Sequence, residues 1–165
     1  MKASGSTIQY IIDPTEEMLM IAVTGWPRAL KYANIQTEKM CLRAVEQDCS
    51  TLRYVKDQTE EMCLRAVRNG SNLKYIRNQT EEMCLMAVRQ RGSLVRFVND
   101  QAEAICLEAV KQDSFALQFI RDQTEEMCIE AVKRKYSSLR YVKDQTPAVC
   151  DAAAKRNKRA VKYIR

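Results

Sequence analysis

The sequence of 165 residues contains no histidine, only four glycines and three prolines, and no long apolar run. Without histidine, the usual base for activating a serine or cysteine nucleophile is missing, and no catalytic constellation is evident. The scarcity of glycine and proline argues against a disordered chain. No stretch approaches the roughly 18–20 apolar residues of a membrane span. The opening MKASGS lacks a signal-peptide core, and residues 1–5 are expected to be a flexible leader.

The seven cysteines do not form a pattern typical of disulfides or of a metal site. Equivalent positions on stacked helices lie roughly 8–10 Å apart, beyond the roughly 4.4–6.8 Å that a disulfide tolerates between Cα atoms. No histidine and no C-x-x-C pair accompanies them. We expect small buried side chains, no metal, no cofactor, and an intracellular, reducing compartment. Six of the seven share one repeat position: Cys41, Cys63, Cys84, Cys106, Cys128 and Cys150.

The whole chain is a repeat array. Residues 57–67 read DQTEEMCLRAV, and related copies recur at spacings of 22, 22, 21, 22, 22 and 22 residues. A fixed period of this size is typical of a solenoid whose units are too small to fold alone. We predict one all-α solenoid over residues 6–165, with about seven 22-residue helix–turn–helix repeats after a half repeat. The threonine position of the repeat is occupied by Thr15, Thr37, Thr59, Thr80, Ala102, Thr124 and Thr146.

Each repeat is predicted to contain two short helices. The first begins at Asp57, with Glu60 completing a capping box, and runs about ten residues. Pro14 directly follows the equivalent Asp13, which favours this Asp/Asn position over the threonine as the N-cap. Its buried face should carry Met62, Cys63, Ala66 and Val67. The second helix spans about eight residues, and its N-cap candidates are Asp48, Asn69, Asp113 and Asn157.

The second helix carries an aromatic residue in every repeat, flanked by two apolar columns. A ring at regular helical spacing is most often part of a core, so we expect these rings to pack in the core, with the tyrosine hydroxyls reaching water or a partner at its edge. The alternative is a set of platforms on which successive RNA bases stack. The aromatic column is Tyr10, Tyr32, Tyr54, Tyr75, Phe97, Phe119, Tyr141 and Tyr163.

A glutamine column is predicted to occupy the first position of the first helix. We expect its amides to bridge neighbouring repeats and to satisfy free backbone groups at the helix end, with Pro14 marking the end of the column. The alternative is a ladder that binds a ligand. The column is Gln36, Gln58, Gln79, Gln101, Gln123 and Gln145.

The basic residues fall into lines on the second helix. Residues 1–151 hold 21 basic and 21 acidic side chains, so the net charge of +6 comes from the C-terminal end. The candidate binding surface comprises Lys31, Arg53, Lys74, Arg96, Arg140 and Lys162 before the aromatic column and Lys56, Arg77, Arg121 and Lys143 two residues after it. The candidate basic patch comprises Lys155, Arg156, Lys158 and Arg159. Basic lines track phosphates in nucleic-acid-binding proteins, but they can also be solvated charges offset by acidic columns.

The run Q-T-E-E-M-C-L-x-A-V, followed by L-R/K-Y-V/I-K/R-D/N-Q-T, resembles an uncharacterised repeat family, domain of unknown function 4116. The resemblance covers residues 8–165 and is strongest in the repeats of Thr59, Thr80 and Thr124. The family has no assigned activity and is known chiefly from giant DNA viruses of amoebae. The resemblance therefore implies a viral or host-interacting protein of the host cytoplasm or virus factory, and no catalytic residue.

The leading hypothesis is a non-enzymatic repeat scaffold for protein–protein interaction. It follows from a regular array with sorted charges and no catalytic chemistry. The first alternative is nucleic-acid binding through the basic columns and the basic C-terminus. The second is a structural protein that self-associates end to end through Ile8, Tyr10 and Ile11 at one end and Val161, Tyr163 and Ile164 at the other. None of these readings involves a membrane.

Overall fold

The computed structural model describes residues 5–70 and 73–165, which fall into two units, Met1–Asn78 and Gln79–Arg165. In both units α-helices alternate with short 3₁₀ helices (η), and no strand occurs in the described part. The first unit contains η1 (Gly5–Tyr10), α1 (Glu16–Gly25), η2 (Pro27–Tyr32), α2 (Glu38–Gln47), η3 (Cys49–Tyr54), α3 (Glu60–Gly70) and η4 (Leu73–Tyr75). The second contains α4 (Glu81–Gln90), η5 (Gly92–Phe97), α5 (Glu103–Gln112), η6 (Ser114–Phe119), α6 (Glu125–Arg134), η7 (Tyr136–Tyr141), α7 (Pro147–Arg156) and η8 (Lys158–Tyr163).

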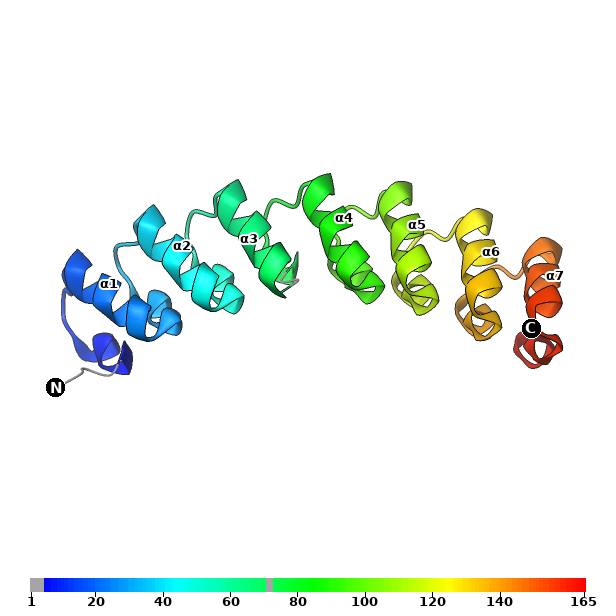
Figure 1. Ribbon diagram of the computed structural model, residues 1–165, viewed down its shortest axis with the longest axis horizontal. Coiled ribbons are helices and arrows are strands. Elements are labelled where there is room, and N and C mark those ends of the chain that lie inside the picture. Colours follow the sequence, from blue (N-terminus) through cyan, green and yellow to red (C-terminus); the bar gives the residue numbers. More distant parts are fainter. Residues whose placement is uncertain (1–4, 71–72) are drawn as a thin grey trace. The chain divides into compact units, whose positions relative to one another are not determined.

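Each unit is built from two layers. In the first unit α1, α2 and α3 pack side by side in chain order, and so do α4 to α7 in the second (Figure 1). The 3₁₀ helices pack on one another in the same order and form the second layer. This nearest-neighbour packing confirms the predicted all-α repeat solenoid. The predicted leader, residues 1–5, lies outside the described residues except for Gly5, with which η1 begins. None of the helices described here is both long and apolar enough to cross a membrane.

The α-helices begin at the threonine position, so the predicted Asp/Asn N-cap is wrong. The hydroxyl oxygen of Thr124 accepts a hydrogen bond from the backbone N–H of Met127, 3.4 Å away. Thr15, Thr80 and Thr146 cap α1, α4 and α7 in the same way. The Asp/Asn residue lies two residues too early to reach these N–H groups. At Asp13 the backbone is left-handed, with a φ of 55°, which an Asp tolerates but an N-cap does not adopt.

The second element of each repeat is a six-residue 3₁₀ helix where it is fully described, not an α-helix of about eight residues. With three residues per turn, Leu52 and Val55 fall on one side and both are buried. The predicted N-caps at Asp48, Asp113 and Asn157 are confirmed by hydrogen bonds from the N–H groups two residues on. The prediction for Asn69 is wrong because α3 continues through it.

The core lies between the two layers and between successive repeats. The α-helices contribute the four predicted columns, represented by Met62, Cys63, Ala66 and Val67, each at most 4% exposed. The 3₁₀ helices contribute the column of Leu52 and the column of Val55. The same columns are exposed at Ile11, Val161 and Ile164. Helices this short are marginal in isolation, so burial of these columns must supply most of their stability.

The glutamine column bridges neighbouring repeats, as predicted. The Nε2 of Gln123 donates to the carbonyl of Leu117 in η6 (2.9 Å) and to that of Tyr141 in η7 (3.0 Å). Its Oε1 accepts from the backbone N–H of Lys143 at 2.9 Å. Gln36, Gln58, Gln101 and Gln145 make the same three bonds. The predicted position was wrong, because each glutamine lies before the α-helix and satisfies the C-terminal ends of two 3₁₀ helices instead.

Candidate functional site

In each unit the basic residues that precede the aromatic column lie over its rings. We call this set the cation–aromatic ladder: Lys31, Arg53, Lys74, Arg96, Arg140 and Lys162 with Tyr32, Tyr54, Tyr75, Phe97, Phe119, Tyr141 and Tyr163. All six cations are exposed. Each lies over the ring that follows it in the chain, at 4.7–5.4 Å from the cation to the ring centroid. The ladder follows the 3₁₀ layer of each unit, which puts it on one surface of the repeat.

The arginines of the ladder also reach the ring of the next repeat. The guanidinium carbon of Arg53 lies 4.7 Å from the Tyr54 centroid and 5.6 Å from that of Tyr75. Arg96 lies 4.7 Å from Phe97 and 5.4 Å from Phe119 in the same way. A planar guanidinium stacks well on aromatic faces, and each exposed contact of this kind contributes about 0.5–1 kcal/mol. The rings therefore favour one orientation of these arginines along the surface.

Arg140 makes the most extensive contacts of the ladder. It lies 5.2 Å from Tyr141, 5.6 Å from Tyr163 and 5.9 Å from Phe115. Phe115 also receives Lys135, whose Nζ lies 4.2 Å from the ring centroid. Phe115 and Lys135 were not among the predicted site residues. Phe115 could have been found from the sequence, because it replaces the serine that most other repeats have at its position.

The aromatic column lies at the edge of the core and is less buried than predicted. The rings from Tyr54 to Tyr163 are half-buried, and Tyr10 is 80% exposed. The reason is the 3₁₀ geometry, because a residue between two members of the buried face lies at its border. The cations also affect the rings: Lys74, with a further contribution from Arg53, lowers the pKa of the Tyr75 hydroxyl.

The ladder differs from the α-helical layer in its ion pairs. On the α-helices Arg65 pairs with Glu61 at 2.7 Å and with Glu46, and Arg89 pairs with Glu108 at 3.2 Å. Among the described residues, by contrast, no ladder cation forms an ion pair with a carboxylate. The charges of the α-helical layer are therefore partly neutralised, whereas those of the ladder are available to an external anion.

The second predicted basic column has a role within the fold. Lys56 donates through Nζ to the carbonyl of Asn34 at 2.9 Å, and Arg77 donates to the carbonyls of Val55 and Lys56. Arg121 and Lys143 make equivalent bonds one repeat back. Within each unit, these four side chains join their own repeat to the preceding one. The predicted binding surface therefore divides into a column bonded to backbone and the ladder.

The predicted basic patch lies at the turn between α7 and η8. Lys155 and Arg156 end α7, where positive charge interacts favourably with the helix dipole. Lys158 and Arg159 are the first two residues of η8, and all four side chains are exposed. The patch lies in the same repeat as Lys162 and adds positive charge near one end of the ladder.

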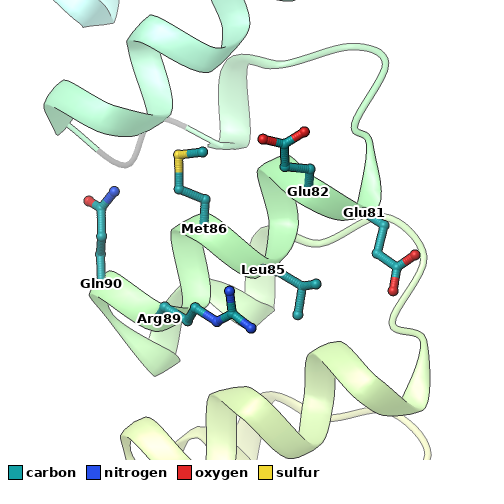
Figure 2. A pocket seen from close by; sticks show the side chains of 6 residues that line it. All are labelled: Glu81, Glu82, Leu85, Met86, Arg89 and Gln90. Atoms are coloured by element: carbon teal, nitrogen blue, oxygen red, sulfur yellow. The ribbon is translucent and has the colours of Figure 1, made fainter.

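The α-helical layer has two open grooves. One groove of about 630 Å³ runs along α4. Figure 2 shows Glu81, Leu85 and Arg89 along one side of that helix and Glu82, Met86 and Gln90 along the other. A second groove, of about 730 Å³, is lined by α1, α2 and Glu61. In the described part of the chain no three acidic or cysteine side chains gather as a metal site would require.

The cysteines of the repeat column are buried except for Cys150, which is half-buried. Burial raises the pKa of Cys41, Cys106 and Cys128 to about 11. The thiolate is the nucleophile and the metal ligand, so these thiols are poorly suited to either role near neutral pH. The thiols of Cys41 and Cys128 instead face the Oε1 atoms of Gln36 and Gln123, at 3.8 and 3.7 Å.

Comparison of the chain with protein-family models, curated proteins and solved structures found no match. The resemblance to the giant-virus repeat family therefore stays a prediction.

Proposed function

We propose that the protein is a non-enzymatic repeat scaffold whose cation–aromatic ladder binds an acidic surface of a partner protein. The observation that carries this proposal is a line of exposed cations oriented by rings and not neutralised by carboxylates in the described part of the chain. Complementary charge along an extended surface provides specificity and orientation to a protein partner. In the α4 groove the side chains lie along opposite sides of the helix, which supports a role without catalysis (Figure 2).

Binding of nucleic acid is the second candidate, because the ladder and the basic patch could contact phosphates. Single-strand binding proteins gain much of their affinity by stacking bases on aromatic rings. Here the rings already receive cations: Tyr75 is contacted by Arg53 and Lys74, and Tyr163 by Arg140 and Lys162. Bases would have to displace these cations in order to stack. This competition favours the protein partner.

A selection from a random peptide library on the immobilised full chain tests the proposal. The ladder variant R96Q/R140Q should lose the acidic peptides that the wild type enriches. The variant K111Q/K133Q is the matched control, because it removes the same charge from exposed positions at the ends of α5 and α6. Circular dichroism should show that both variants remain folded.

Three outcomes would overturn the proposal. The wild type could enrich no acidic peptides, or the ladder variant could select the same sequences as the wild type. The third is a single-stranded RNA 20-mer that binds the wild type more tightly than any selected peptide and loses affinity in R96Q/R140Q. That result would identify nucleic acid as the ligand of the ladder.

A further inference from the structure

We infer that the ladder recognises an extended polyproline II segment of its partner with an acidic side chain at every third residue. This inference rests on the proposed function and specifies its ligand. Within a unit, consecutive 3₁₀ helices pack directly on one another. Neighbouring packed helices lie about 8–10 Å apart, so consecutive ladder cations recur at about that interval. A polyproline II helix rises about 3.1 Å per residue with three residues per turn, which places every third side chain on one face about 9.3 Å apart.

An extended β-strand fits the interval less well. Its side chains on one face recur every second residue, about 6.7 Å apart, and would fall out of step with the cations within two repeats. Polyproline II also leaves its backbone free of internal hydrogen bonds and needs no sheet edge to pair with. The described part of the chain contains no strand that could provide such an edge.

The arginines of the ladder are oriented to receive carboxylates. A guanidinium whose faces contact rings keeps its N–H edge for a bidentate bond to a carboxylate. In the part of the chain that the structure describes, Arg96 makes no hydrogen bond to a protein acceptor, Arg53 makes a polar contact only with the Tyr75 hydroxyl, and Arg140 uses only Nε, on the carbonyl of Ser137 at 3.2 Å. Because the rings already restrict these side chains, less conformational entropy is lost when an anion binds.

Gln118 breaks the ladder and gives the second unit a distinct pattern. The series there is Arg96, Gln118, Arg140 and Lys162. Gln118 carries no charge, and one of its two amide N–H groups already donates to the carbonyl of Phe115 at 3.0 Å, so it attracts a carboxylate less than an arginine would. We infer that the matching segment carries acidic, neutral polar, acidic and acidic residues at intervals of three.

Binding of fluorescein-labelled 15-residue peptides to the full chain, measured by fluorescence polarisation, tests the spacing. The first peptide has glutamate at every third position and proline elsewhere, and the second has the same composition with glutamates at alternating intervals of two and four. The first should bind at least tenfold more tightly than the second. R96Q/R140Q should weaken the first at least tenfold, and K111Q/K133Q should change it less than twofold.

A gain of affinity separates this inference from a general loss of folding. Gln118→Arg completes the ladder. It should tighten binding of the first peptide severalfold and leave the affinity for the second peptide unchanged. Equal binding of the two peptides, lost in R96Q/R140Q, would overturn the spacing and leave the proposed function intact. If neither peptide bound, the result would count against both this inference and the proposed function. Tighter binding of a helical peptide with glutamate at every seventh position would overturn the polyproline II conformation.

Discussion

The cysteine side chains show how burial controls chemistry at the scale of single residues. Burial raises the pKa of Cys41, Cys106 and Cys128 from 9.0 to about 11, so between these values the folded chain holds protons that the unfolded chain has released. Stability from this source is complete below pH 9 and declines as the pH rises towards 11. The urea midpoint should fall over this range. In C41A/C106A/C128A the fall should be shallower, and an unchanged slope would contradict this account.

The N-caps provide a second test at the residue scale. Thr124→Ala removes the acceptor for the N–H of Met127 and should lower the free energy of unfolding by about 1 kcal/mol. Asp122→Ala, at the position expected from the sequence to be the cap, should change it by less than about 0.5 kcal/mol, because Asp122 is exposed. Urea denaturation of both variants distinguishes the two positions. A larger loss of unfolding free energy in Asp122→Ala than in Thr124→Ala would identify Asp122 as the N-cap.

At the scale of secondary-structure elements, the glutamine bridges join consecutive 3₁₀ helices. Gln123→Leu removes two donors and one acceptor from half-buried backbone partners, so we expect a loss of about 2–4 kcal/mol. Gln118→Ala is the control, because its amide bonds only within η6 and its loss should cost less than about 1 kcal/mol. Thermal unfolding of the two variants makes the comparison. Similar melting temperatures would mean that the bridges contribute little.

Two glycines test how closely the elements approach each other. A Cβ at Gly92 would collide with the carbonyl oxygen of Ala109, where η5 meets α5, so Gly92→Ala should destabilise by about 1–3 kcal/mol. Gly25 ends α1 with no atom near its missing Cβ. Gly25→Ala should therefore leave stability unchanged or raise it by up to about 1 kcal/mol. The urea midpoint should fall for Gly92→Ala and should stay level or rise for Gly25→Ala, and an unchanged midpoint for Gly92→Ala would show that η5 can move.

The sequence was sufficient to predict the architecture. The predictions that failed did so for physical reasons. The 22-residue period and the columns of Met62, Cys63, Ala66 and Val67 were enough to predict the repeats and their buried α-helical face. The cap was misassigned because Asp57 and Thr59 both suit an N-cap and only the backbone decides between them. The 3₁₀ form was missed because periods of 3.0 and 3.6 residues are hardly distinguishable over six residues. That error made the rings look like core and hid their stacking with the ladder cations.

At the scale of the whole molecule, stability should be divided among repeats. The second unit, Gln79–Arg165, contains four α-helices, four 3₁₀ helices and their shared core columns. Three or more stacked repeats usually suffice for a stable array. We predict that residues 79–165 expressed alone are helical by circular dichroism and unfold cooperatively in urea. A fragment with the spectrum of an unfolded chain would contradict this prediction.

Pro14 occupies the glutamine position of the first repeat, and it has no amide to bridge η1 to η2. The polar contact recorded in its place is a long one, 3.5 Å from Asn34 Nδ2 to Asp13 Oδ1. Each of the fully described glutamine bridges stabilises the boundary between two repeats. The boundary between η1 and η2 lacks such a bridge. Opening should therefore begin at η1, whose amides should exchange with deuterium sooner than those of η6 or η7. The next boundary, between η2 and η3, should stay closed, because Gln36 bridges it with three hydrogen bonds.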